Sequence, residues 1–151
     1  MTVQIDGVDQ LKQYCGKQLG YSSWHKVTQE QIDRFADATG DHQWIHVDQE
    51  AAKQGPFGTT IAHGYLTLSL LPILLPEVLE VKNVGMAVNY GINKLRFPAP
   101  VPSNSEVRLS ALISNVNEFE SGVQLEMEVT IEVRDSQKPS LVGQILFRYY
   151  N

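Results

Sequence analysis

The chain has 151 residues, of which 42% are hydrophobic and 19% are charged, a balance typical of one folded globular domain. This length excludes a two-domain enzyme with a separate cofactor module. Twelve basic against seventeen acidic residues give a net charge of −5, which argues against a protein that binds nucleic acids or membrane surfaces.

The first elements expected along the chain are a strand within residues 20–27 and a helix directly after it. Thr28, followed three residues later by Gln31, is a capping-box pattern, and apolar residues then recur with helical spacing. Gly40 is the expected C-terminal stop of this helix, because glycine adopts the left-handed conformation found there without strain.

Two more helices are expected in the first half of the chain. Asp48 is the predicted N-cap of a short helix that ends before Gly55. The most apolar run predicts a helix from near Thr60, with an end limited or kinked by Pro72 and Pro76. Because this helix is apolar nearly all round, we expect it to be enclosed on most of its sides.

The second half of the chain alternates apolar and polar residues, which is the pattern of strands that bury one face. The strands are expected at 84–97, 107–113, 123–133 and 145–149. A hairpin turn is expected at 119–122, and a one-residue slip of the alternation predicts a bulge near 91–94. The sequence therefore predicts an α+β fold, in which one long antiparallel sheet wraps around one very apolar helix.

The polar stretch 38–48 holds the first candidate catalytic pair, Asp41 and His46. A histidine exchanges protons near neutral pH, and a carboxylate beside it orients the ring or shares a bound water. The alternative is structural: Asp41 caps a turn after Gly40, and His46 is a buried, hydrogen-bonded histidine. Spacing alone leaves both interpretations open.

The second candidate site is the stretch 58–65, which leads into the apolar helix. A helix N-terminus presents unpaired N–H groups and the positive end of the helix dipole. Gly64 has no side chain, so a ligand can approach its N–H closely. Such close approach is needed to bind a carbonyl oxygen that gains negative charge during a reaction. Packing alone also explains a glycine there, and His63 is either a ligand contact or a structural histidine.

Metal binding is the competing chemistry. His42 and His46 are four residues apart, with Asp48 and His63 near them in sequence. The stop at Gly40 and the cap at Asp48 indicate a loop between them, and the chain has no HExxH pattern, so we expect no metal. It also has no GxGxxG, P-loop or GxSxG motif, so the sequence supports neither a redox cofactor nor phosphoryl transfer.

The single cysteine, Cys15, permits neither an internal disulfide nor a cysteine-based zinc site. The lack of a disulfide framework fits a reducing compartment. No secretory signal is evident in the first twenty residues, and the apolar run 61–75 is too short to span a bilayer. We therefore expect a cytoplasmic protein.

Two motifs taken together resemble a known family. The pattern TGDxxxIHxD over residues 39–48, followed by AHG over 62–64, is similar to the MaoC-like (R)-specific enoyl-CoA hydratases, and most of all to their nodulation-protein-N-like branch. The segment 94–101 is also similar to this family, and the resemblance extends from about Val27 to the C-terminus. Many members have Asn-Pro where this chain has Gln43-Trp44, a difference that bears on the shape of the acyl pocket.

The resemblance implies a single hot-dog domain over residues 1–151 that forms a homodimer. It implies an enzyme that adds water to a trans-2-enoyl-CoA to give a (3R)-3-hydroxyacyl-CoA, or catalyses the reverse dehydration. Coenzyme A is then part of the substrate, and no cofactor is needed. Asp41 and His46 match the catalytic dyad of the family, and Gly64 matches the backbone donor to the thioester oxygen. The sequence does not distinguish the base from the acid.

Further residues are expected to contact the substrate. The start of the apolar helix should border the thioester, one strand should line the acyl or pantetheine channel, and basic residues, Lys94 among them, are candidates for the phosphates of coenzyme A. The predicted contacts are Ile61, Ala62, His63, Gly64, Ala87, Val88, Asn89, Tyr90, Arg96, Pro98 and Arg148.

Two alternative functions remain open at this point. An acyl-CoA thioesterase of the same fold would use the same helix start but direct water at the carbonyl carbon, and the intact Asp41–His46 pair favours hydration over it. A module that binds acyl-CoA or acyl carrier protein without turnover is the non-enzymatic alternative.

Overall fold

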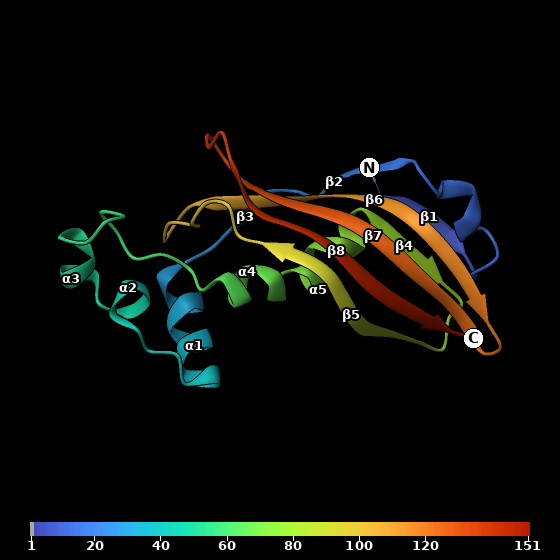
Figure 1. Ribbon diagram of the computed structural model, residues 1–151, viewed down its shortest axis with the longest axis horizontal. Coiled ribbons are helices and arrows are strands. Elements are labelled where there is room, and N and C mark those ends of the chain that lie inside the picture. The colour runs from blue at the N-terminus through green and yellow to red at the C-terminus, as the bar shows by residue number, and fades with distance from the viewer. Residues whose placement is uncertain (1) are drawn as a thin grey trace.

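The computed structural model describes residues 2–151. Figure 1 shows a long curved sheet with a central helical segment against one face and a group of short helices at one end. The main sheet has the strand order β2-β6-β7-β8-β5, with β3 paired to β6, and all of its pairings are antiparallel. Its strands are β2 (Gln18–Tyr21), β3 (His25–Lys26), β5 (Met86–Arg96), β6 (Glu106–Phe119), β7 (Gly122–Val133) and β8 (Pro139–Tyr150).

The predicted alternation is confirmed in the long strands. In β7, Leu125, Met127, Val129 and Ile131 are buried, whereas the polar residues that alternate with them are partly or fully exposed. The hairpin turn between β6 and β7 lies at the predicted place, because Phe119 pairs with Gly122. The register of β5 shifts between Ile92 and Lys94, as predicted, and also between Asn89 and Gly91, which was not predicted.

A second, two-stranded sheet was not predicted from the sequence. In it, β1 (Val3–Asp6) pairs in parallel with β4 (Leu79–Lys82). A short 3-10 helix, η1 (Leu11–Tyr14), follows β1 and buries Leu11 completely. These elements close one end of the core.

The helices α1 (Gln29–Thr39) and α3 (Gln49–Lys53) begin at the predicted caps. The Thr28 hydroxyl accepts a hydrogen bond from the Gln31 N–H at 3.1 Å, and the Asp48 carboxylate accepts one from the N–H of Ala51. Gly40 ends α1 with a φ of 84°, in the left-handed region that favours glycine. Between these helices the predicted loop contains one helical turn, α2 (Trp44–Val47).

The central helical segment consists of α4 (Gly64–Ser69), α5 (Leu71–Leu74) and the 3-10 turn η2 (Leu75–Glu77) in succession. Its predicted start near Thr60 is wrong, because the residues before Gly64 bond to other parts of the chain. The Ile61 N–H donates to the Ile45 carbonyl, and the Ala62 N–H donates to the Val101 carbonyl.

The expected enclosure of this helical segment is also incomplete. Leu66, Leu70 and Leu74 are buried against the sheet, but the opposite side is open, with Tyr65 69% and Ile73 56% exposed. Among residues 2–151, no helix is long and apolar enough to cross a membrane.

Candidate active site

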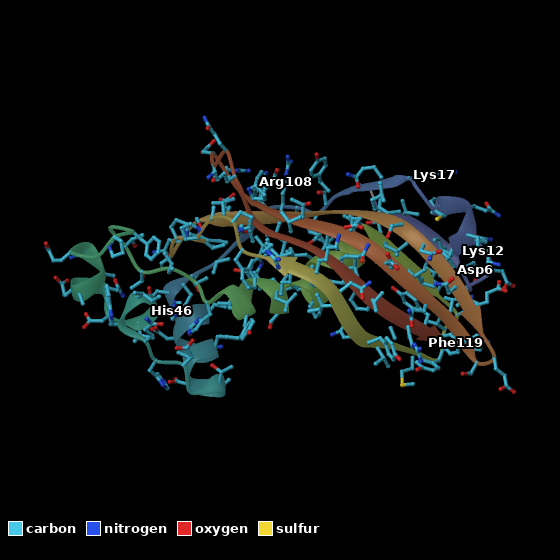
Figure 2. All side chains as sticks on the ribbon, viewed as in Figure 1. Asp6, Lys12, Lys17, His46, Arg108 and Phe119 are labelled. Carbon is cyan, nitrogen blue, oxygen red and sulfur yellow. The ribbon has the colours of Figure 1, made fainter. Side chains whose placement is uncertain are left out.

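Asp41 and His46 lie close together at the end of the molecule that carries the short helices, where Figure 2 labels His46. Asp41 directly follows the glycine stop of α1, and His46 is part of α2. The Oδ2 atom of Asp41 is 4.0 Å from the Nε2 atom of His46. That distance is too long for a direct hydrogen bond, and it leaves both atoms able to contact one water molecule.

The other ring nitrogen of His46 fixes its tautomer. Nδ1 lies 2.7 Å from the carbonyl oxygen of Ile61, and because a carbonyl only accepts, Nδ1 carries the hydrogen. The lone pair of Nε2 then faces Asp41. Burial lowers the pKa of His46, an effect that the Ile61 carbonyl and Asp41 oppose and His63 reinforces. His46 is therefore a neutral proton acceptor at neutral pH.

Asp41 and His46 also have the structural roles that the sequence left open, as a turn cap and as a buried, hydrogen-bonded histidine. The Oδ1 atom of Asp41 accepts a hydrogen bond from the Gln43 N–H at 3.3 Å, so one carboxylate oxygen closes a turn while the other faces His46. The side chain of Asp41 is 52% exposed, whereas that of His46 is 8% exposed. The carboxylate thus meets solvent, and the imidazole is enclosed.

Gln29, at the first position of α1, was missed by sequence reasoning. Its amide nitrogen donates to the His46 carbonyl at 2.8 Å and to Asp33, and its amide oxygen accepts from the buried hydroxyl of Thr60. A glutamine at a helix start carries no recognisable signal, and Thr60 lies 31 residues away in sequence. Through Gln29, α1 holds both α2 and the segment that leads to α4.

Gly64 is the first residue of α4, and no hydrogen bond within residues 2–151 uses its N–H. A Cβ atom at this position would lie 3.0 Å from the ring of Phe97. Gly64 borders a groove of about 340 Å³. The groove is lined by Phe57, Ile61, Ala62, Gly64, Thr67, Phe97, Pro98, Ala99, Pro100, Val101 and Ser140.

The structure brings several predicted contact residues together and separates others. Ile61, Ala62, Gly64 and Pro98 share the groove, but His63 turns inward onto His46, at a ring-centroid distance of 3.8 Å. Arg96 is exposed at the end of β5, next to Phe97 of the groove.

The remaining predicted contacts lie farther along the sheet. Ala87 and Asn89 line a groove beside α5 and η2, and Val88 pairs with Arg148 in β8. The guanidinium of Arg148 stacks on Tyr90 and lies 4.9 Å from the ring centre of Phe119, which Figure 2 shows at the opposite end from His46. One copy of the chain therefore does not bring Arg148 to the dyad.

The Gln43-Trp44 pair, which departs from the family pattern, does not line the groove. A Cβ atom at Gly55 would lie 2.9 Å from the Trp44 ring, so Trp44 packs closely on the turn after α3. Trp44 therefore has a local role, which is to hold α2 against α3.

Asp41, His46 and His63 place potential ligand atoms within 4.8 Å of one another. However, the two imidazole rings are stacked with an interplanar angle of 21°, and one nitrogen of each ring already lies at a main-chain carbonyl, of Ile61 for His46 and of Asp41 for His63. His42 instead pairs with Asp37 at 2.8 Å. The arrangement fits proton transfer better than metal binding.

Comparisons with known proteins identify the family of this chain. The family model of the MaoC like domain matches residues 10–136. The 3-hydroxyacyl-thioester dehydratase Z of Mycobacterium tuberculosis is 50% identical over 146 residues, covering 96% of this chain and 97% of that protein. Nodulation protein N of Rhizobium leguminosarum bv. viciae is 44% identical over 132 residues, covering 85% of this chain and 81% of that protein.

Solved structures confirm the predicted hot-dog fold. R-hydratase PhaJ1 from Pseudomonas aeruginosa, in its unliganded form, has a TM-score of 0.72 at 19% identity, over 96% of this chain and 87% of that chain. The (R)-hydratase from A. caviae involved in PHA biosynthesis has a TM-score of 0.72 at 21% identity, over 88% of this chain and 94% of that chain. With a family model over most of its length and a half-identical relative over nearly all of it, this chain belongs to the MaoC-like dehydratase family.

Proposed function

We propose that this hydro-lyase adds water to trans-2-enoyl-CoA to give (3R)-3-hydroxyacyl-CoA, and catalyses the reverse dehydration, with Asp41 and His46 as its catalytic dyad. The observation that carries the proposal is the buried, neutral His46, whose Nε2 lone pair faces Asp41. A relative named as a 3-hydroxyacyl-thioester dehydratase and two structures named as (R)-hydratases support the substrate class and the stereochemistry.

In this proposal, Gly64 activates the substrate by binding its thioester carbonyl. The thioester carbonyl oxygen accepts a hydrogen bond from the unpaired N–H of Gly64 at the start of α4. This interaction withdraws electrons from the C2=C3 bond and stabilises the enolate-like charge that forms on the oxygen. One such donor is worth about 2.7–4 kcal/mol in comparable oxyanion sites.

The dyad supplies the water. A water molecule held between Asp41 Oδ2 and His46 Nε2 attacks C3, and Nε2 takes one of its protons as the new C–O bond forms. The pair then returns one proton to C2, so one water is consumed for each double bond. In dehydration, the pair takes the proton from C2, and Nε2, protonated in that step, donates a proton to the departing hydroxyl group, which leaves as water.

Coenzyme A is the proposed carrier of the acyl group. Lys94 and Arg96 are exposed at the end of β5 that leads into the groove, where they offer positive charge to phosphates. The side chain of Arg96 has a single hydrogen bond within residues 2–151, to the carbonyl of its neighbour Leu95, so its remaining guanidinium N–H donors are available.

A homodimer is the proposed assembly. Within residues 2–151, β5 pairs with β8 on one side and leaves its other edge free. Large apolar side chains are exposed on β5 and on the open side of the central helical segment. They are Tyr65, Ile73, Met86, Tyr90 and Ile92. A second copy, related by two-fold symmetry, would cover both features.

An assay of crotonyl-CoA hydration tests the function, and the loss of enoyl absorbance measures the rate. We expect Asp41→Asn and His46→Gln each to lower kcat by about 10²–10⁴-fold, the range that general acid–base catalysis contributes. His42→Gln is the matched control, because this exposed histidine pairs with Asp37 and should leave the rate unchanged. Crotonyl-pantetheine should show a higher KM than crotonyl-CoA if the phosphates contribute to binding.

Each contrary outcome of this assay has a defined meaning. Near-wild-type rates in both dyad variants would contradict the proposed dyad. Release of free thiol without hydration would identify a thioesterase. Tight binding of crotonyl-CoA without turnover would identify a binding module.

A further inference from the structure

We propose that His63 is a positioning residue that holds both members of the dyad, and that it does not contact the substrate. Its Nε2–H fixes the main chain of Asp41, and its ring supports one face of the His46 imidazole. The inference rests on the proposed function, because it concerns how that dyad is kept in place.

The described interactions of the His63 ring are with Asp41, His46 and Phe35. The side chain is 3% exposed, and its Nε2 atom lies 2.9 Å from the carbonyl oxygen of Asp41. Its ring stacks on His46 at a centroid distance of 3.8 Å and meets the ring of Phe35 from α1 at 4.9 Å. The side chain of His63 thus meets both members of the dyad, Asp41 by a hydrogen bond and His46 by ring stacking.

The tautomer of His63 follows from the same hydrogen bond. The Asp41 carbonyl only accepts, so Nε2 carries the hydrogen and Nδ1 keeps a bare lone pair. This Nδ1 atom is buried and has no hydrogen-bond partner within residues 2–151. A buried acceptor without a partner destabilises a fold, so stability alone is a poor explanation for a histidine at this position.

The donated hydrogen bond acts on the geometry of Asp41. The Asp41 carbonyl and carboxylate belong to the same residue, in an exposed loop between α1 and α2. A shift of this main chain moves Oδ2 relative to His46 Nε2, and displacement of a catalytic group by about 1 Å can cost 10²-fold in rate.

The stacked ring acts on the charge of His46. The titratable groups that face the His46 ring are Asp41 from the loop and His63 from the start of α4, while α1 contributes the neutral amide of Gln29 at the backbone. The stacked imidazole lowers the pKa of His46, because like charges at this distance repel. The ring of His63 therefore favours the neutral, proton-accepting form of His46.

Two variants separate these effects. His63→Phe keeps an aromatic ring but removes the hydrogen-bond donor, and we expect kcat to fall by about 10- to 100-fold with little change in KM. His63→Gln keeps an N–H donor within reach of the Asp41 carbonyl but removes the second imidazole. We expect it to retain most of the kcat and to move the acid limb of the kcat/KM profile to higher pH.

Independent readouts decide between the possible outcomes. Thermal unfolding of both variants and NMR titration of the His46 ring report on folding and on its pKa without any turnover. A raised KM at unchanged kcat would identify a substrate contact and overturn the inference. Losses of kcat that match the loss of folded protein, with an unmoved pH profile, would identify a purely structural residue and also overturn it.

The dyad variants distinguish a failure of this inference from a failure of the proposed function. If Asp41→Asn and His46→Gln are inactive while His63→Phe has the wild-type rate, only the role of His63 is wrong. If both dyad variants are active, the proposed function is wrong at its first step.

Discussion

The proposed role of His46 as a base rests on the different surroundings of its two ring nitrogens. The Ile61 carbonyl holds the hydrogen on Nδ1, and Nε2 is left to face the carboxylate of Asp41. Of the causes that set its pKa, burial is the largest, and it favours the uncharged ring. One buried imidazole thus combines a fixed tautomer with a form able to accept a proton.

The lowered pKa of His46 predicts the pH dependence of the reaction. The acid limb of the kcat/KM profile for crotonyl-CoA hydration should lie below the ordinary histidine value of 6.5, because protonation removes the base. The unfolded chain binds this proton more readily than the folded one, so the contribution of His46 to stability is present above pH 6.5 and falls as the pH drops through the folded pKa. An acid limb clearly above 6.5 would contradict the assignment.

At the residue scale, sequence identified candidate reacting groups but not the residues that support them. Asp41, His46 and Gly64 were candidates because proton transfer and oxyanion binding each require a particular residue type. The tautomer of His46 depends on a carbonyl 15 residues away, which spacing does not reveal. The side chain of His63 was expected to border the thioester, but it is turned onto His46, a direction set by tertiary packing.

At the element scale, Gln29 joins three segments of the site. Gln29→Ala leaves the His46 carbonyl and the Thr60 hydroxyl without this partner, at an expected cost of about 1–3 kcal/mol. Because α2 and the start of α4 are then held less firmly, kcat should fall as well. Gln49→Ala is the matched control, since Gln49 is the exposed first residue of α3. Thermal unfolding and initial rates measure both effects, and a Gln29→Ala variant indistinguishable from Gln49→Ala would rule out this role.

Local signals predicted elements well, and non-local pairing explains the failures. The caps at Thr28 and Asp48 and the stop at Gly40 operate within a few residues, so the sequence locates them. The start of the central helix was misplaced because its preceding residues bond to Ile45 and Val101. The β1–β4 sheet joins segments 76 residues apart, such as Val3 and Leu79, and no local pattern predicts that pairing.

At the scale of the whole molecule, two features favour packing against a second copy of the chain. They are the apolar character of the central helix and the free edge of β5. Sequence predicted a helix enclosed on most sides, yet Tyr65 and Ile73 are exposed in a single copy. The two grooves beside this helix are lined by residues of α5 and β5. A second copy would complete the enclosure that the apolar sequence anticipates.

The proposed homodimer predicts the effect of a charge on this open face. In light scattering coupled to size exclusion, the wild-type chain should have twice the mass of one copy, and Ile73→Asp should shift it toward the single-chain mass. An unpaired carboxylate buried at an interface costs several kcal/mol, which corresponds to a dissociation constant raised more than about a hundredfold. Val142→Asp is the matched control, because Val142 is 40% exposed in β8, where the side chains of its neighbours Leu141 and Ile145 are buried on the helix side. Two results would contradict this interface: an Ile73→Asp variant that remains a dimer, or a wild-type chain with the mass of one copy. If activity is lost together with the dimer, the second copy is needed to complete the groove.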